Sequence, residues 1–421
     1  LRREKGSALF QVETLASIGC DGPEERLPPA TLSSSNKGLC VLVGSQLHLF
    51  DAGCTSLLAT LNLDGTVELA SWSDDGTFLV VGTSTGVLHF VDVNRTQVLF
   101  SQEMFPNKKG RAFLSINFLA SSENDCHNLV VLSGTGTLFY FSNIQLHALQ
   151  TAIAARDMKS AGLVRAAIRL QHQSVLHMHD KSVRGAAISM IHGEESIITW
   201  GSGKAGICVW KATTELSLKS YAGRILRGCE ISHASVSLDG YLIAVDATSE
   251  VSVWLLPELV LLKTGPTGIE HIYLCPPIES TLETTACDGK NQTVVLAAGG
   301  SPRTKAVRVC SGVELAVEYE LEVDSSTDVA NVSDAESIYF LEGKMEDLIP
   351  KFHIRCLSPT LPTNRFYHLL NKKRFDEAMQ LAQLFGLDIE MVHRVQLTSL
   401  LDEGDKNPHT PDLLNKLKTS L

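Results

Sequence analysis

One pattern recurs along this chain and restricts the folds open to it: two short β-rich runs joined by a tight turn. In "TFLVVGTSTGVLHFVDV", residues 77–93, β-branched and aromatic runs flank a Gly-containing turn, which is typical of a β-hairpin. The same arrangement returns at residues 128–143, 196–218 and 241–262, and a further β-rich run precedes each copy. A further strand can follow the hairpin, as "TQVLF" does at residues 96–100, so the units contain four strands and follow one another about 40 residues apart, the period of a β-propeller.

Fainter units complete the set at residues 31–63, 269–323 and 329–357. The seven units predict a mainly β fold, a seven-bladed β-propeller over residues 1–361. It is WD40-like without the Gly-His and Trp-Asp signatures, although Trp210 and Trp254 fall where such a Trp could lie. The early strand at residues 8–18 belongs to no unit. We expect it to pair in the blade that contains Ile354, because an open ring leaves strand edges unpaired.

Two segments show helical rather than β spacing. Residues 144–182 are rich in Ala and Leu, and we expect a helical insertion between blades there. We expect residues 362–401 to form successive helices: apolar residues from Phe375 to Phe385 lie on one helix face, Gly386 ends that helix, and Asp388 can cap the next. Such short successive helices are typical of the start of an α-solenoid. We expect residues 402–421 to be a linker and a possible terminal helix.

Two stretches match catalytic or nucleotide-binding motifs in their letters only. Gly82-Thr83-Ser84-Thr85-Gly86 spells G-x-S-x-G, and "GSGKAG" at residues 201–206 spells G-x-G-x-x-G. A nucleophile elbow and a dinucleotide loop both need a helix after the motif, whereas a β-rich run follows each here. Ser84 and Lys204 are therefore predicted to lie in hairpins. We expect neither an enzyme nor a cofactor.

Composition excludes further classes of function. The net charge is −11 with no long basic block, which argues against nucleic-acid binding, and no apolar run is long enough to predict a membrane span. The ten cysteines are scattered without a C-x-x-C pair, as expected of reduced thiols inside a cell. The sequons at Asn94, Asn291 and Asn331 would suggest secretion only with a signal peptide, and none is visible.

Three candidate binding features remain. His172, His177 and His179 precede Asp180 in "HQSVLHMHD", which leaves a metal site open, although a loop is the simpler interpretation. The basic run at residues 106–111 could contact an acidic partner. Paired carboxylates elsewhere fall in turns, where solvated side chains are expected.

Val98, Leu99 and Phe100 are consecutive apolar residues on the expected outer strand of the second blade. Alternation along a strand would turn some of them away from the core between blades. Either a neighbouring loop buries them or they form an apolar docking patch. We predict them as partner-binding residues.

The segments "EKGSALFQVETLASI", "FLVVGTSTGVLHFVDV" and above all "IRCLSPTLPTNRFYHLLNKKRFDEAMQLAQLFGLDIEMVHRV" resemble the N-terminal region of the Rod (Rough deal) family of kinetochore-associated proteins. These are the largest subunits of Rod–Zwilch–zeste-white-ten complexes. The resemblance implies a propeller followed by a long α-solenoid. It also implies a location in the cytoplasm, and at the kinetochore and spindle in mitosis.

The same resemblance implies the partners. Zwilch and farnesylated Spindly are expected to dock on this region, and zeste-white-ten to bind through the rest of a full-length chain. Dynein–dynactin and Mad1–Mad2 would be indirect partners, and the complex would support checkpoint signalling. We predict that Val98, Leu99 and Phe100, with the helical insertion as a second wall, bind the farnesyl group, whose burial could contribute several kcal/mol at about 25 cal/mol per Å².

Two other functions stay open. One is a propeller–solenoid subunit of a vesicle-tethering complex at the endoplasmic reticulum, which would bind tethering subunits instead of Zwilch. The other is an enzyme with its site in the central channel, which requires titratable residues on the inner strands. Those strands offer mainly Ser, Ala and a lone His233, which a channel-lining role explains.

Overall fold

We describe a computed structural model of the chain. The residues it describes are 4–6, 10–20, 27–35, 37–105, 112–120, 126–179, 182–212, 216–222, 230–237, 239–275, 293–299, 304–311, 314–330, 337–346, 349–360, 362–371 and 373–406. The basic run at residues 106–111, Asp180, Asn291 and Asn331 lie outside them.

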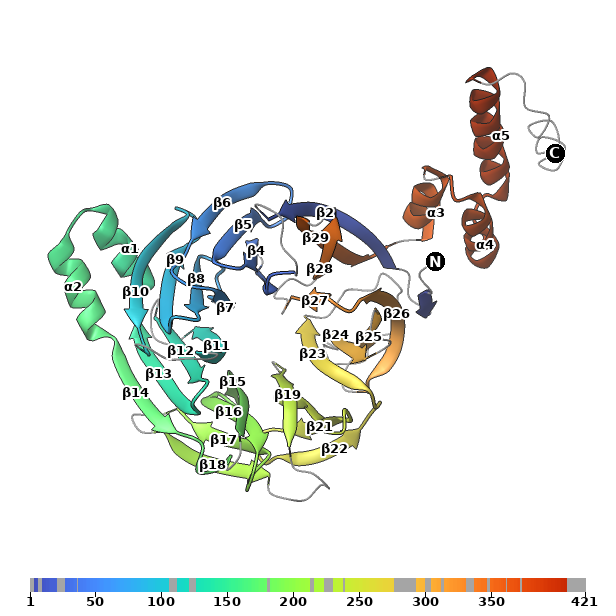
Figure 1. Cartoon of the computed structure of the whole chain (residues 1–421). Coiled ribbons are helices and arrows are strands. Elements are labelled where there is room, and N and C mark those ends of the chain that lie inside the picture. The colour runs from blue at the N-terminus through green and yellow to red at the C-terminus, as the bar shows by residue number, and fades with distance from the viewer. Residues whose placement is uncertain are drawn as a thin grey trace. The chain divides into compact units, whose positions relative to one another are not determined.

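Seven antiparallel sheets stand in a ring around a central opening, as the repeat predicted (Figure 1). Blade 1 holds β3 (Ala30–Ser35), β4 (Gly38–Val43), β5 (Gln46–Asp51) and β6 (Leu57–Asn62). Blade 2 holds β7 (Val67–Trp72), β8 (Phe78–Thr83), β9 (Val87–Asp92) and β10 (Gln97–Glu103). Blade 3 holds β11 (Phe113–Ala120), β12 (His127–Ser133), β13 (Thr137–Ile144) and β14 (Arg169–Ser174).

The ring continues through the second half of the chain. Blade 4 holds β15 (Ser182–Ile191), β16 (Glu194–Ser202), β17 (Ile207–Lys211) and β18 (Ser217–Ala222). Blade 5 holds β19 (Ile231–Val236), β20 (Tyr241–Asp246), β21 (Val251–Leu255) and β22 (Val260–Thr264). Blade 6 holds β23 (Ile269–Cys275), β24 (Thr293–Gly299), β25 (Thr304–Ser311) and β26 (Ala316–Asp324), and β1 (Glu4–Gly6) adds a fifth strand beside β26.

Blade 7 joins the two ends of the ring. It holds β27 (Asp328–Val329), β28 (Ile338–Glu346), β29 (Ile349–Pro359) and β2 (Phe10–Gly19) in the order β2-β29-β28-β27. The early strand therefore pairs in the blade that contains Ile354, which confirms the expected closure. The Ser17 hydroxyl lies 2.8 Å from Nδ1 of His353 across this pairing. Because β2 lies beside β29, the ring closes through hydrogen bonds between distant parts of the sequence.

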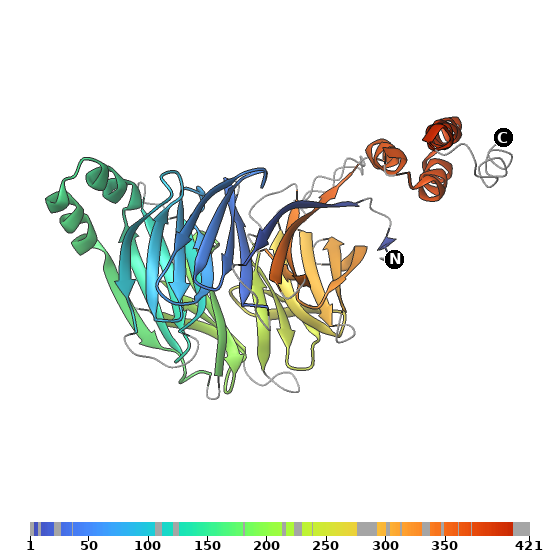
Figure 2. The same cartoon turned by 45° about the horizontal axis from the view of Figure 1, so that its top comes forward.

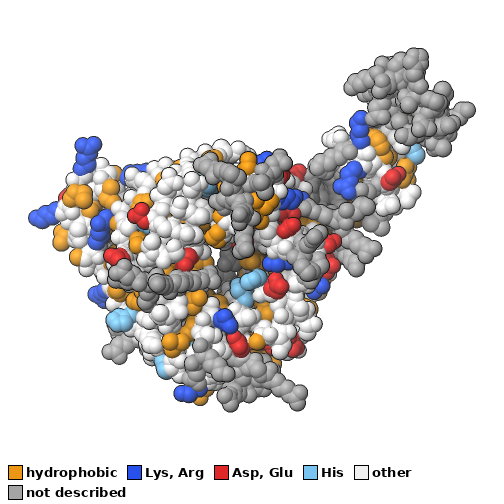
Figure 3. Space-filling model, viewed as in Figure 1, with side chains coloured by type: hydrophobic (Ala, Val, Ile, Leu, Met, Phe, Trp, Pro, Cys, Tyr) orange, Lys and Arg blue, Asp and Glu red, His pale blue; other side chains and the backbone are white. Residues whose placement is uncertain are grey.

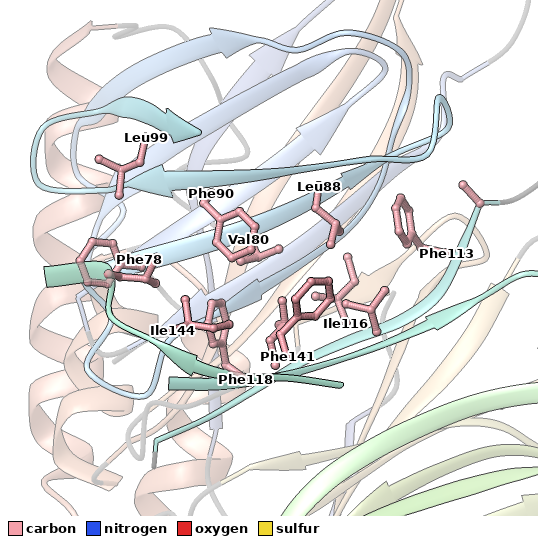
Figure 4. Close-up of a cluster of buried hydrophobic side chains, with 14 of the residues drawn as sticks. Phe78, Val80, Leu88, Phe90, Leu99, Phe113, Ile116, Phe118, Phe141 and Ile144 are labelled. Atoms are coloured by element: carbon pink, nitrogen blue, oxygen red, sulfur yellow. The ribbon is translucent and has the colours of Figure 1, made fainter. Parts of the chain in front are cut away.

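The core lies between neighbouring blades. Every residue of β4, β8 and β12 is buried, which explains the apolar runs within these strands. The aromatic cluster between blades 2 and 3 includes Phe78, Phe90 and Phe113 (Figure 4). In other blades, Cys40 and Cys310 are buried, and burial raises the pKa of each thiol to about 12. Both behave as small apolar side chains.

The helical insertion lies within blade 3 rather than between blades. Helices α1 (Leu146–Ala154) and α2 (Met158–Ala167) follow β13, and β14 then returns to pair with β13. The expected helical range of 144–182 was too long because it included β14. The sequence of this strand, "RLQHQS", has no β-branched residue and so gave no sign of β structure. Its pairing with β13 is a tertiary contact that the local pattern does not reveal.

Three helices form the second unit of the chain. They are α3 (Pro362–Asn371), α4 (Phe375–Phe385) and α5 (Ile389–Lys406), which pack through one apolar cluster. Gly386 ends α4 with a φ of 64°, and the Asp388 carboxylate accepts a hydrogen bond from the Met391 amide at 3.3 Å, as expected. Residues 402–406 continue α5 and are not a linker, and the possible terminal helix lies outside the described residues. None of the described helices combines the length and the apolar character needed to cross a membrane.

Candidate interaction surface

The predicted partner-binding residues lie on β10, and a β-bulge decides which way each faces. Val98 pairs with Val91 and Phe100 with Phe90, so Leu99 is the extra, bulged residue. A bulge sets two residues opposite one, which breaks the strict alternation of a strand. Leu99 (6% exposed) packs into the cluster of Phe90 (Figure 4). Phe100 packs against the same cluster, and the rings of Phe90 and Phe100 stack 4.2 Å apart. Only Val98, at 39%, is exposed.

These three residues therefore do not form an open apolar patch. The expectation was that some of the three side chains face outward; Val98 does, whereas the bulge places Leu99 in the core. Burial by a neighbouring segment, the alternative interpretation, describes Leu99. Whether any of the three contacts a partner stays a prediction.

The same bulge recurs on the outer strands of other blades. The bulged residue is Leu58 in β6, Lys219 in β18, Leu262 in β22 and Glu318 in β26. Leu58 and Leu262 are each 47% exposed, whereas Leu99 is buried. The difference is the helical hairpin α1–α2, which lies outside β10 (Figures 1 and 2).

Side-chain contacts fix this hairpin on blade 2. The Gln150 side-chain amide donates to the buried Asp92 carboxylate at 2.7 Å, and His147 Nε2 lies 3.2 Å from Oδ2 of Asp75. The Arg165 guanidinium donates to the Leu99 carbonyl oxygen at 3.2 Å and lies 5.1 Å from the centre of the Phe100 ring. The hairpin thus covers the backbone and the apolar side chains of β10 together.

A hollow of about 700 Å³ lies between the two helices. Small side chains line much of it: Ala148, Ala152 and Ala155 from the α1 segment and Ser160 from α2, with Val164 beside them. Asp157 caps α2 by accepting a hydrogen bond from the Ser160 amide at 3.1 Å. Nothing in the local sequence pattern indicated the hollow, because it forms only when the two helices pack.

The two letter motifs lie in hairpins, as predicted. Ser84 lies in the turn between β8 and β9, and its hydroxyl oxygen accepts a hydrogen bond from the Thr66 amide at 3.1 Å. Lys204 lies in the turn between β16 and β17. A strand follows each motif, so neither has the helix that a nucleophile elbow or a dinucleotide loop requires.

The three histidines of the open metal hypothesis do not converge. His172 is exposed on β14, and His177 lies with its ring edge toward Trp210. His179 is buried; its Nδ1 lies 3.0 Å from the Ala205 carbonyl and its Nε2 2.9 Å from the Thr199 hydroxyl, which also accepts from the Trp210 indole. Since a carbonyl only accepts, Nδ1 carries the proton. Within the described part of the chain, no three metal-ligating side chains come together.

Titratable side chains do meet beside the central opening, which the sequence reading missed. The rings of His233 (β19) and His271 (β23) lie 5.2 Å apart. The Tyr273 hydroxyl donates to Asp328 at 3.3 Å, and the other Asp328 oxygen accepts from the Thr31 hydroxyl at 2.7 Å. Inner strands of blades 5, 6, 7 and 1 thus approach one another through polar contacts, and histidine and acidic side chains line the opening (Figure 3).

Burial sets the protonation of this group. It lowers the pKa of His233 to about 4, with a further contribution from neighbouring His271, and it raises the pKa of Asp328 against the opposing hydrogen bond from Thr31. The Ile272 amide donates to Nδ1 of His233 at 3.3 Å, so the proton of the neutral ring is on Nε2. The pattern is that of a hydrogen-bonded junction between blades in which the His233 ring is neutral.

Two family models match nearly the whole chain. "KNTC1, N-terminal" matches residues 1–358, and "KNTC1 first ARM-repeats domain" matches residues 368–421. The first corresponds to the propeller, and the second overlaps the helices from α3 onward.

Full-length and structural relatives agree with these matches. The chain is 26% identical over 418 residues to kinetochore-associated protein 1 of Homo sapiens and 26% identical over 420 residues to that of Mus musculus. Each alignment covers 96% of this chain but 19% of the relative, so the chain spans about a fifth of their length. A chain in the structure named "Crystal Structure of Mitotic Checkpoint Complex" has the same fold, with a TM-score of 0.52 and 15% identity over 82% of this chain and 92% of that one.

Proposed function

Because this chain belongs to the KNTC1 N-terminal family, which is a family of kinetochore-associated proteins, we propose that it is a non-catalytic interaction scaffold of the outer kinetochore. In this proposal the chain docks Zwilch and farnesylated Spindly and so supports dynein–dynactin recruitment and checkpoint signalling through Mad1–Mad2. Zeste-white-ten would bind through the remainder of a full-length chain. The cytoplasm, with the kinetochore and spindle in mitosis, is the proposed location.

The family match over residues 1–358 is the observation that carries the proposal. The fold supports it, since a closed ring of seven sheets presents loops and outer strands from every blade as contact surfaces. The hairpin positions of Ser84 and Lys204 support the non-catalytic part. In the channel, hydrogen bonds between blades already engage Asp328 and His233, which supports a structural role for both.

A pull-down tests the partner assignment. The folded chain is immobilised and offered Zwilch, farnesylated Spindly, unmodified Spindly and tethering subunits of the endoplasmic reticulum, each separately. We expect retention of Zwilch and of farnesylated Spindly above unmodified Spindly. Retention of the tethering subunits alone would replace the kinetochore proposal by the tethering one.

The role of β10 in farnesyl binding needs its own variant. The double substitution Leu99→Asp with Phe100→Asp places charges in a packed cluster, so it tests stability before binding. Val98→Asp changes only an exposed side chain of the same strand. If β10 contacts the farnesyl group, Val98→Asp weakens binding of farnesylated Spindly and leaves Zwilch bound. Unchanged Spindly binding by this variant would place the site elsewhere.

A further inference from the structure

The α1–α2 hairpin is basic on an otherwise acidic chain. Residues 144–174 contain Arg156, Lys159, Arg165 and Arg169 against the single acid Asp157, a formal charge of 4 − 1 = +3, whereas the whole chain carries −11. Arg165 binds β10, and Asp157 caps α2. Among the described residues, no ion pair engages the other three basic side chains, which are all exposed. Two of these cations, Arg156 and Lys159, belong to the hairpin and the third, Arg169, begins β14, and all three are available to an outside partner.

The same hairpin carries the two most exposed large apolar side chains of the described residues. Met158 is 69% and Leu163 is 65% exposed, both on α2. Apolar and basic side chains gather over this hairpin, at the upper left of the space-filling view (Figure 3). Beside them lies the hollow of about 700 Å³ whose alanines leave room for larger side chains. The hollow combines the apolar side chains of Ala148, Ala152, Ala155 and Val164 with polar ones, Asp157 among them, and exposed apolar side chains beside such a hollow mark a candidate interaction surface.

Charge complementarity selects the partner. A segment with carboxylates complements Arg156 and Lys159, the two exposed cations of the hairpin, and one or two large apolar side chains in the same segment fill the hollow. An anionic membrane fits less well. A membrane-surface helix needs a broad apolar face, whereas α2 exposes two large apolar residues and the hairpin lacks the dense basic cluster of lipid-binding segments.

We propose that the hollow between α1 and α2 is a docking site for an acidic segment of a partner protein, which places large apolar side chains among Ala148, Ala152 and Val164 and carboxylates against Arg156 and Lys159. The segment is recognised by this chemistry. The inference does not depend on the kinetochore partners proposed above, so the two can fail separately.

Selection from a display library tests the proposal without a known ligand. A library of random peptides of about sixteen residues is selected on the intact chain, and the binders are measured by fluorescence anisotropy. Two variants probe the site: Lys159→Glu with Leu163→Gln, and Ala148→Leu, which fills the hollow from an exposed position. All three introduced residues are good helix formers, so the helices should persist. Leu262→Gln makes the same leucine-to-glutamine change as Leu163→Gln at another exposed position (47%), on β22 away from the hairpin, and is the matched control.

We expect the selected peptides to be acidic with Leu, Phe or Met at helical spacing. Their affinity should fall about tenfold or more in both site variants, fall again as salt rises, and stay unchanged in Leu262→Gln. Selection of neutral or basic peptides, failure to select any, or equal binding by the site variants would overturn the proposal. So would tighter binding of phosphatidylserine vesicles than of any selected peptide, because it would assign the hairpin to a membrane.

Discussion

At the scale of single residues, the position of a bulge decides whether an apolar side chain is core or surface. Leu58 and Leu99 occupy the same bulged position of two neighbouring blades, on β6 and β10. Both are leucines, yet Leu58 is 47% and Leu99 6% exposed. Because the residue type is the same in both, comparing the two leucines isolates the effect of the covering hairpin on side-chain exposure.

This pair gives a direct stability prediction. Leu99→Ala should lower the free energy of unfolding by about 3 kcal/mol, because it leaves a cavity in a packed aromatic cluster. Leu58→Ala should cost no more than about 0.5 kcal/mol, as is usual for exposed positions. Urea denaturation of the two variants and the parent measures the difference. Equal losses would show that the hairpin does not shield Leu99 in solution.

At the scale of elements, the two strands near the start of the chain pair with different blades, and their consequences for ring closure differ. β2 fills a position in blade 7, where β29 would otherwise be an edge. β1 adds a fifth strand to a blade that already has four. Ring closure should therefore depend on β2 and hardly on β1.

Two truncations test this difference. Removal of residues 1–19 should lower the melting temperature by roughly 5 °C or more and promote association through the exposed edge of β29. Removal of residues 1–6 takes away β1 alone and should have a much smaller effect. Scanning calorimetry and light scattering follow the two properties. A truncation through residue 19 that stays monomeric and as heat-stable as the parent would contradict closure by β2.

At the scale of the whole molecule, buried histidines make the ring sensitive to acid. Burial lowers the pKa of His48, His89, His233 and His271 below the ordinary value of 6.5. A group whose folded pKa is lowered binds fewer protons in the folded state than in the unfolded state over that interval. Its stabilisation is complete above pH 6.5 and is lost as pH falls toward the folded value.

His233 gives the largest share of this effect. Its pKa of about 4 implies a loss of at most about 3 kcal/mol between pH 6.5 and 4. We expect stability to fall over that range and to fall less in His233→Gln, which has no proton to gain. Asp328 acts in the opposite sense, since its raised pKa favours the folded state at low pH. A pH dependence that is identical in the parent and His233→Gln would refute the assignment to His233.

The sequence by itself determined the architecture. Blade number, ring closure by the early strand and the hairpin positions of Ser84 and Lys204 all follow from alternation, turn residues and period, which are local properties of the chain. The end of α4 at Gly386 was also predictable from the sequence. Helices commonly end at a residue in the left-handed conformation, and glycine adopts that conformation most easily. Membership of the kinetochore-associated family agrees with the resemblance carried by residues 354–395.

Only the tertiary structure decided the surface. The bulge at Leu99 and the strand identity of residues 169–174 depend on hydrogen bonds to partner strands, which no local pattern contains. The hollow between α1 and α2 and the meeting of His233 with Asp328 and its neighbours require elements distant in sequence to pack. Local energies fix which residues form strands and turns, whereas exposure and contact between side chains are properties of the assembled ring.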